Sequence, residues 1–343
     1  MKTRVFTLLA SSYFLLSCAN PSIRPLQSQG NPNLRPGIQS QSVPQGIETA
    51  VNPERMAAYL ATFTGIRPLA PNTLIPERGT VQGRELTRQF LTQTLTELGY
   101  KVERHEYRRN AANIMVRLMA DTPSDEYILV GAHMDSVRNA GADDNASGST
   151  AVLEAATVLR ELKGRKVNLI FAWFDEEELG LVGSRHLARE LRTQGLKINS
   201  VHAIDMMGFD GDGDHALELA RPDGVLWDYY KMVNQTHKLN LPLDRTNTGR
   251  SDHVSFHDEG YDSLCISEEF TNGDSTPHYH RRSDTYETVS QSFLVAGTQL
   301  IVATVGDLSL KVPAPVNIQM VPHDRFPSRE REFHDSYDNL PHD

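Results

Sequence analysis

The feature that most constrains the fold is an almost unbroken apolar run at residues 167–174, which reads Val-Asn-Leu-Ile-Phe-Ala-Trp-Phe. A run of this length and composition is typical of a β-strand that is covered on both faces. Strand-like segments alternate with helical patterns along the rest of the chain. The sequence therefore predicts an α/β fold, a three-layer sandwich with a mixed, largely parallel central sheet.

The individual elements follow from apolar periodicity and from residues that stop helices. In residues 85–98, for example, Phe90, Leu91 and Leu95 share one helical face, and Gly99 follows as a stop. The predicted strands are residues 102–107, 113–119, 127–132, 167–174, 198–204 and 261–266. The predicted helices are residues 54–62, 85–98, 150–162, 185–194, 225–238 and 289–308.

The beginning of the chain predicts export. Residues 1–17 start with positive charge and continue with an apolar run too short to span a membrane, as a secretory signal peptide does. Leu15-Leu-Ser-Cys18 resembles the lipidation site of bacterial lipoproteins. The resemblance implies cleavage before Cys18, acylation of that residue and an anchor in the cell envelope, with the outer membrane favoured. The alternative is an ordinary secretory signal with an incidental cysteine, and then a secreted protein.

Composition divides the rest of the chain. The polar, Pro-rich residues 18–50 predict a flexible tether, residues 51–311 a folded domain, and residues 312–343 a disordered tail.

With Cys18 in the signal, Cys265 has no disulfide partner, and its apolar surroundings indicate a buried core thiol. The net charge of −10 at pH 7 argues against nucleic-acid binding, which requires basic surface.

Histidines and carboxylates collect where the predicted strands end. The acidic run 175–178 directly follows the apolar strand, and four adjacent carboxylates repel one another unless a cation compensates. Ligands in open α/β sheets bind at such strand ends. Imidazole and carboxylate groups together suit zinc, and other divalent ions can take the same donors. The candidates are His133, Asp144, the acidic run 175–178, Asp205 and the histidines of Pro277-His-Tyr-His280.

The order of these residues resembles that of a known family, the secreted two-zinc aminopeptidases, which include the bacterial leucyl-type enzymes and belong to the same structural group as glutaminyl cyclase. The resemblance covers about residues 50–310, which would then be a metallopeptidase catalytic domain. The motifs that carry it are His133-Met-Asp-Ser136, Gly141-Ala-Asp-Asp-Asn-Ala-Ser-Gly148, Glu177-Glu-Leu-Gly-Leu-Val-Gly-Ser184, Asp205-Met-Met-Gly208, Gly249-Arg-Ser-Asp-His253 and His280-Arg-Arg-Ser-Asp-Thr285.

The resemblance implies two divalent metal ions, with zinc favoured. One ion would be held by His133, Asp205 and one oxygen of Asp144. The other would be held by Glu178, His280 and the second oxygen of Asp144. The family also has a cis peptide bond after the bridging aspartate, which is Asp144 here.

Three further residues receive catalytic roles from the resemblance. Glu177 would act as the general base toward a hydroxide that bridges the two metals, and later as the acid toward the leaving amine. Asp135 would hold the second ring nitrogen of His133. Tyr279 would stabilise the oxyanion, and simple packing of its loop is the alternative. The implied substrates are peptides, from which single amino-terminal residues are removed.

Three other functions use the same scaffold. A glutaminyl cyclase carries a long insertion after its Glu-Glu pair and a tryptophan before its last histidine, whereas here residues 179–184 follow directly and Tyr279 precedes His280. A carboxypeptidase shares the metal site. A binding module without catalysis would have lost ligands, and here all of them are present. The segment Asp210-Gly-Asp-Gly-Asp214 reads as a solvated acidic turn rather than a calcium loop.

Overall fold

The computed structural model describes residues 46–270 and 273–311. The predicted signal peptide, Cys18, tether residues 18–45 and the tail 312–343 lie outside the described residues. Residues 46–50, which composition assigned to the tether, belong to ordered structure: Ile47–Ala50 form the 3₁₀ helix η1. There Glu48 is buried, and its Oε2 lies 2.7 Å from Nδ1 of His237. The ordered part of the chain therefore begins earlier than the sequence indicates.

The described residues form alternating helices and strands, as predicted. The helices are α1 (Pro53–Phe63), α2 (Val81–Glu97), α3 (Gly148–Leu159), α4 (Val182–Thr193), α5 (Gly224–Thr236), α6 (His253–Asp258) and α7 (Gln291–Leu310). The strands are β1 (Val102–Arg108), β2 (Ala111–Leu118), β3 (Glu126–His133), β4 (Asn168–Phe174), β5 (Lys197–Ile204), β6 (Leu217–Ala220), β7 (Leu243–Thr246) and β8 (Ser263–Ser267). Two short turns of helix, η2 (Ala142–Ser147) and η3 (Tyr286–Thr288), lie in the connections.

The eight strands form one mixed sheet in the order β1-β2-β4-β3-β5-β8-β6-β7. Its centre is parallel, because β4, β3, β5 and β8 all run in the same direction. Antiparallel pairs flank that centre, β2 against β4 on one side and β6 against β8 on the other. The predicted mixed, largely parallel α/β sheet is confirmed.

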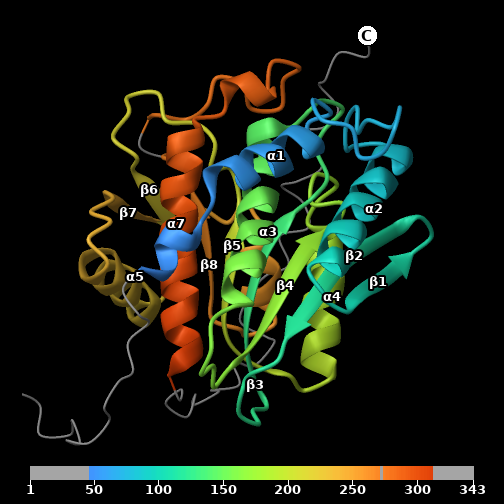
Figure 1. Cartoon of the computed structure of the whole chain (residues 1–343). Helices are drawn as coiled ribbons and strands as arrows, with labels where there is room; N and C mark the ends of the chain where they lie inside the picture. The colour runs from blue at the N-terminus through green and yellow to red at the C-terminus, as the bar shows by residue number, and fades with distance from the viewer. Residues whose placement is uncertain (1–45, 271–272, 312–343) are drawn as a thin grey trace, which may run out of the picture. The chain divides into compact units, whose positions relative to one another are not determined.

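Helices cover both faces of the sheet, which explains the continuous apolar run of β4. Leu169 and Phe171 face a core shared with α1, α2, α3 and α7, whereas Ile170 and Ala172 face a second core with α4 and α6. Every residue of β4 is buried. Figure 1 looks onto the side of the sheet that α1, α3 and α7 cover.

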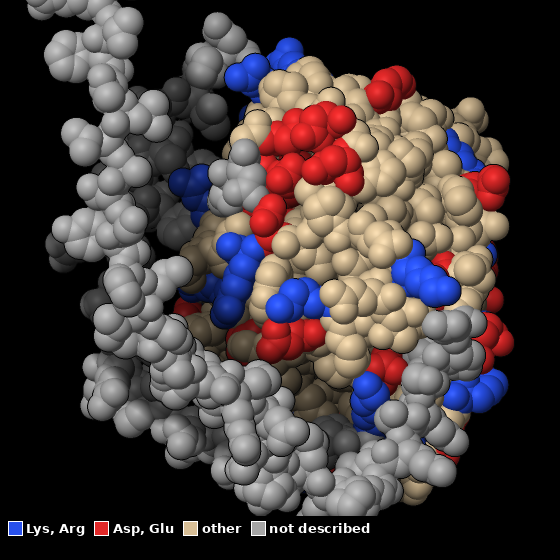
Figure 2. All heavy atoms as spheres, turned by 90° about the vertical axis from the view of Figure 1, so that its left-hand side faces the viewer, with Lys and Arg blue, Asp and Glu red and all other residues tan. Residues whose placement is uncertain are grey.

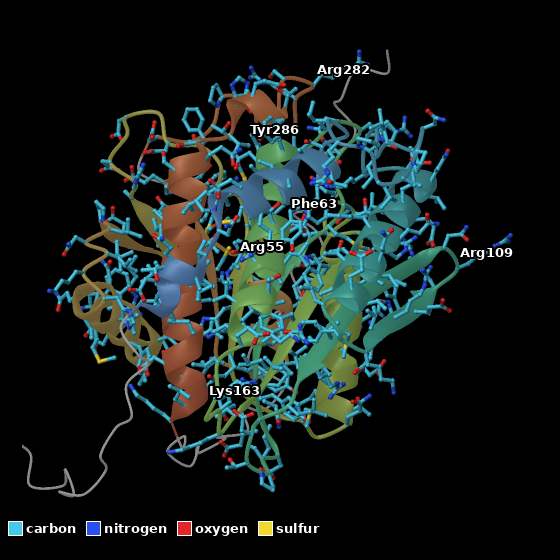
Figure 3. The ribbon with its side chains drawn as sticks, in the orientation of Figure 1. Arg55, Phe63, Arg109, Lys163, Arg282 and Tyr286 are labelled. Carbon is cyan, nitrogen blue, oxygen red and sulfur yellow. The ribbon has the colours of Figure 1, made fainter. Side chains whose placement is uncertain are left out.

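Side-chain caps and ion pairs set the helix positions. In α1, Asn52 Oδ1 accepts a hydrogen bond from the Arg55 backbone N at 2.7 Å, which satisfies a free donor of the first turn. Arg55 then pairs with Glu154 of α3 at 2.5 Å, and Phe63 at the other end of α1 is fully buried (Figure 3). The α2 helix begins four residues earlier than predicted, because Thr80 caps it through the backbone N of Gly83.

Three short elements were not predicted: β6 and β7, with four residues each, and the six-residue α6. They lie in a polar part of the chain that gives little periodicity. Among the described residues, α7 is the one helix that is long and apolar enough to cross a membrane. However, 78% of its most apolar stretch is buried inside the domain. It is a core helix of the sandwich.

The acidic turn before β6 uses its carboxylates as hydrogen-bond acceptors. Asp210 accepts from the backbone N of His215 at 3.2 Å, and Asp212 accepts from that of Asp214 at 3.2 Å. Figure 2 shows acidic side chains gathered near the top of the face that carries α5 and β7. Such bonds are typical of the solvated turn that the sequence predicted.

Candidate metal centre

The candidate ligands meet at one edge of the sheet, because parallel strands present their carboxyl ends together. His133 is the last residue of β3, Asp205 directly follows β5, and the acidic run 175–178 directly follows β4. Asp144 lies in η2, in the loop that leads into α3, and His280 lies between β8 and α7. Elements far apart in the sequence thus converge on one site.

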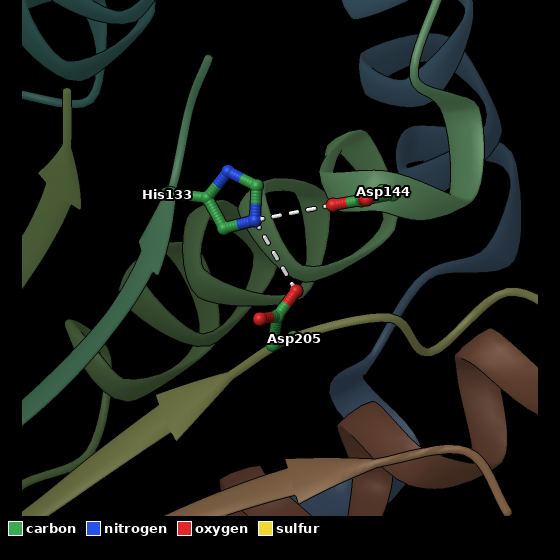
Figure 4. Close-up of side chains that lie close together, drawn as sticks. All are labelled: His133, Asp144 and Asp205. Carbon is green, nitrogen blue, oxygen red and sulfur yellow. Dashed lines mark hydrogen bonds and ion pairs between the residues drawn. The ribbon is translucent and has the colours of Figure 1, made fainter. Parts of the chain in front are cut away.

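Two groups of ligand atoms lie within this site. In the first, Nε2 of His133 is 3.2 Å from Oδ1 of Asp144 and 3.2 Å from Oδ1 of Asp205 (Figure 4). In the second, Nε2 of His280 is 3.2 Å from Oδ2 of Asp144 and 3.0 Å from Oε2 of Glu178. Asp144 offers one carboxylate oxygen to each group, so it stands where a shared ligand is required.

The loop that carries Asp144 is held by Asp284. Its Oδ1 accepts from the backbone N of Asp143 at 2.8 Å, and its Oδ2 accepts from that of Asp144 at 3.1 Å. Asp284 is buried at 1% exposure, so few waters can replace these bonds. The peptide bond between Asp144 and Asn145 is cis, as the family resemblance implied.

The acidic run 175–178 divides into two pairs. Asp175 is neutralised by α2, with Arg84 Nε at 3.0 Å and Arg88 Nη1 at 2.7 Å from its oxygens. Glu176 pairs with Arg84 at 3.0 Å and with Arg108 at 2.6 Å. The sequence suggested one repulsive cluster of four carboxylates, but arginines compensate the first two, and only the last two belong to the ligand site.

Asp135 contacts both His133 and the segment that carries Glu177 and Glu178. Its carboxylate accepts from the backbone N of Glu177 at 3.1 Å and from that of Glu178 at 3.3 Å. Its Oδ1 also lies 3.5 Å from Nδ1 of His133, while the hydrogen-bond partner of that nitrogen is the Asp135 backbone oxygen at 3.2 Å. A hydrogen bond donated by Nδ1 there would leave Nε2, which faces Asp144 and Asp205, as the nitrogen that could bind a metal ion.

The site carries excess negative charge. Burial lowers the pKa of His280, but its hydrogen bonds with Asp144 and Glu178 outweigh burial and raise that pKa to about 10. Burial raises the pKa of Glu178 to about 7, and Asp144 adds to the shift while His280 opposes it. Two imidazoles and three carboxylates around this charge are a donor set that fits two divalent ions.

Glu177 is free of these contacts and faces the adjacent pocket. Its pKa is raised, first by burial and then by Asp252 and Glu178, although His133 opposes the shift. A carboxylate with a raised pKa is suited to accept a proton near neutral pH.

Tyr279 forms another part of the pocket wall. Its ring stacks on that of His280 with centroids 3.8 Å apart, and meets the ring of Phe270 edge-on at 6.2 Å. Burial and the nearby carboxylates, Asp144 first, raise the pKa of Tyr279, so its hydroxyl stays protonated and can donate a hydrogen bond. Tyr279 is 41% exposed and lines the pocket beside the ligand groups.

The backbone around the ligands is strained in three places. Glu176, Met206 and His280 have φ values of 60°, 61° and 55°, in the left-handed region that disfavours non-glycine residues. Each costs about 1 kcal/mol or more, and such positions concentrate at functional sites. Two of them are direct neighbours of candidate site residues in the chain, and the third is itself a candidate ligand.

One buried residue at the site had no sequence signature. Arg78 is fully buried, and its guanidinium donates to the backbone oxygens of Phe63 at 3.2 Å, Met134 at 2.9 Å and Gly141 at 2.7 Å. It therefore ties the loop between His133 and Asp144 to α1. Nothing in the polar loop around Arg78 distinguishes it from a surface arginine.

Comparison with known proteins identifies the family. A model of peptidase family M28 matches residues 113–305, which is more than half of the chain and includes all five candidate ligands. The chain belongs to peptidase family M28. A probable leucine aminopeptidase from Trichophyton verrucosum is 32% identical over 209 residues, which are 55% of each chain. Aminopeptidase YwaD from Bacillus subtilis is 33% identical over 57% of this chain and 44% of its own length. The chain thus spans about half the length of the curated relatives it matches.

Solved structures support the fold. The LapA aminopeptidase of Legionella pneumophila has a TM-score of 0.68 and 22% identity over 78% of this M28 chain and 75% of its own. A zinc aminopeptidase from Bacillus subtilis has a TM-score of 0.54 and 29% identity, over 59% and 50% of the two chains. Glutaminyl cyclase from Porphyromonas gingivalis has a TM-score of 0.63 and 17% identity, over 75% and 98%. The fold is therefore shared by peptidases and cyclases and does not separate them.

Proposed function

We propose that this M28 chain is a zinc-dependent aminopeptidase, which hydrolyses the first peptide bond of peptides. The observation that carries the proposal is the position of Asp144, whose two oxygens lie 3.2 Å from His133 and 3.2 Å from His280. One carboxylate between two complete ligand groups is what a pair of metal ions requires. The similar Bacillus subtilis structure is a zinc aminopeptidase, which supports the choice of metal.

The five ligands divide as the two groups indicate. His133 and Asp205 would hold one ion, Glu178 and His280 the other, and Asp144 both. When bound, two divalent ions polarise the scissile carbonyl and lower the pKa of water toward neutrality.

The remaining steps fall to the side chains of the pocket. Glu177 would accept the proton from the attacking water and return it to the leaving amine, which its raised pKa allows. The Tyr279 hydroxyl would donate to the oxyanion that develops on the carbonyl oxygen. Asp135 would position Glu177, because its carboxylate accepts the Glu177 backbone N–H.

Export as a lipoprotein is part of the proposal. A signal peptide at residues 1–17, a lipid on Cys18, a tether and the tail 312–343 would place the catalytic domain, residues 51–311, outside the cytoplasm. Metabolic labelling with radioactive palmitate tests this assignment. Label that disappears in Cys18→Ser supports it, and label-free wild-type protein in the culture medium contradicts it.

Hydrolysis of aminoacyl-nitroanilides tests the activity. The full-length chain in detergent is assayed as isolated, after chelation, and after zinc is restored, beside Glu177→Gln. We expect release that the chelator abolishes and zinc restores, and a loss of about 100-fold or more in Glu177→Gln at unchanged zinc content. No release from folded, zinc-loaded protein would refute an aminopeptidase, and cyclisation of glutaminyl peptides would then be the next assay.

A further inference from the structure

Two loops beside the second ligand group carry exposed arginines. Arg281 directly follows the candidate ligand His280, and the residue before Arg138 donates its backbone N–H to Oε1 of Glu178 at 3.2 Å. The two loops are joined, because the buried Asn139 donates through Nδ2 to the backbone oxygen of Arg281 at 2.9 Å. Arg138 and Arg281, which we call the arginine flank, are both exposed. They therefore extend from a fixed backbone next to Glu178 and His280.

Neither arginine of the flank has a partner in the part of the chain that the structure describes. Their guanidinium groups form no ion pair and no hydrogen bond there. By contrast, Arg88 and Arg108 each pair with a carboxylate of the acidic run 175–178. Arg282 is exposed as well, and it lies at the end of the domain where the parallel strands finish (Figure 3). Positive charge beside the second ligand group is thus available to an anionic ligand.

The flank and the pocket adjoin different parts of the sheet edge. In the strand order β4-β3-β5-β8, Met206 after β5 and Cys265 of β8 line the pocket, whereas the flank adjoins the loops that follow β3 and β4. An aminopeptidase holds one residue before the cleaved bond and a longer chain after it. The pocket with its buried Cys265 suits the single residue. The exposed flank suits the part of the substrate that leaves.

Chain geometry limits which group of a substrate meets the flank. Neighbouring Cα atoms are about 3.8 Å apart, and an extended peptide advances about 3.3 Å per residue. Arg281 is one residue from a candidate metal ligand, so a group that it binds lies within a few residues of the cleaved bond. A guanidinium group binds a carboxylate through two parallel hydrogen bonds, a geometry that selects carboxylates over neutral groups.

We propose that the arginine flank binds a carboxylate on the part of the substrate that follows the cleaved bond. The proposal rests on the aminopeptidase activity proposed above and names its substrate class. That class is short peptides with a free carboxyl terminus, or peptides with an acidic residue within about three positions of the cleaved bond. Both sources present the same group to the same guanidinium groups. Water screens exposed charges, so the effect on binding is moderate and weakens with salt.

Three substrates that differ only at one end test the proposal: Leu-Gly-Gly, its carboxyl-terminal amide, and the carboxyl-terminal amide of Leu-Gly-Asp. Release of leucine by the full-length, zinc-loaded chain is measured at low salt and at about 0.5 M salt. At low salt, KM should be about 3–10-fold lower for the two substrates that carry a carboxylate, at similar kcat. High salt should reduce this difference, and Arg138→Gln/Arg281→Gln should remove most of it.

Arg109→Gln/Lys163→Gln is the matched control. Both residues are exposed, and Figure 3 shows them away from the end of the domain that carries Arg282. The difference in KM should persist in this control. A lower KM for Leu-Gly-Gly alone would identify the chain terminus as the bound group, and a lower KM for the Leu-Gly-Asp amide alone would identify an acidic side chain. Equal KM values for all three substrates, or a difference that survives Arg138→Gln/Arg281→Gln, overturn the proposal.

A binding measurement separates this proposal from the proposed activity. Calorimetry on zinc-loaded Glu177→Gln should show about 3–10-fold tighter binding of Leu-Gly-Gly than of its amide, and adding Arg138→Gln/Arg281→Gln should remove the difference. Equal affinities would overturn the flank as a carboxylate site. If no substrate is hydrolysed, or if the terminal glycine is released before leucine, the aminopeptidase activity fails, and the calorimetric comparison still decides the role of the flank.

Discussion

Asp284→Asn is the substitution that most directly tests how the metal loop is held. The carboxylate of Asp284 accepts two backbone N–H groups, from Asp143 at 2.8 Å and from Asp144 at 3.1 Å. An asparagine keeps the size of the side chain but offers only one oxygen. Its amide nitrogen must then face one of the two N–H groups, which loses its partner inside the protein.

The expected magnitude follows from that lost bond. A buried donor without a partner costs about 1–3 kcal/mol. The unpaired N–H group belongs to Asp143 or Asp144. We therefore expect the substitution to disturb the orientation of the Asp144 carboxylate, which is the shared ligand. That energy corresponds to about a 10–100-fold loss of zinc affinity, which is the usual cost of changing a residue that orients a metal ligand.

A competition titration of zinc against a chromophoric chelator measures this loss, and the chain supplies a matched control. Asp274 also accepts two backbone N–H groups, from Gly211 at 2.7 Å and Asp212 at 3.3 Å in the acidic turn before β6, but it accepts both on Oδ2, so an asparagine there can keep both bonds. Asp274→Asn should leave zinc affinity unchanged. Equal zinc affinity in Asp284→Asn and Asp274→Asn would refute the reasoning, and so would a loss confined to thermal stability.

Three further predictions concern other parts of the molecule. Tyr279→Phe should lower kcat about 100-fold with little change in KM, and a change in KM alone would contradict the oxyanion role. Arg88→Met removes one of the positive charges that face the buried Asp175, so the free energy of unfolding measured in urea should fall by about 3–5 kcal/mol. The exposed Arg104→Met should lower it by less than about 1 kcal/mol. Equal losses in the two variants would contradict this prediction. Burial lowers the pKa of His202 from 6.5 to about 3, so the unfolded chain alone gains this proton as pH falls below 6.5. The free energy of unfolding should therefore drop by about 2 kcal/mol from pH 7.5 to pH 5, and His202→Gln should flatten that slope; parallel slopes would contradict it.

The central strands and the ligand set were predictable because both have strong local signatures. The run that forms β4 is apolar at nearly every position, and this composition occurs where a strand is covered on both faces. The ligands occupy ordered motifs at strand ends, so the topology that brings His133 and Asp205 together follows from the alternation of strands and helices. The structure places all five beside one another, and their roles as zinc ligands stay predictions.

The residues that hold the site were not predictable, since their partners come from distant segments. Arg84 and Arg88 look like surface positions of α2 until Asp175 is seen beside them. Asp284 belongs to a recognised motif, but its bonds to the loop of Asp144 exist only in the folded chain.

The number of zinc ions bound per chain tests the central claim most directly. Equilibrium dialysis of the full-length chain, followed by elemental analysis, should give two ions per chain, and Asp144→Ala should lose affinity for both because its carboxylate faces both groups. A single ion per chain, or two ions held undiminished by Asp144→Ala, would contradict a two-metal centre built around Asp144.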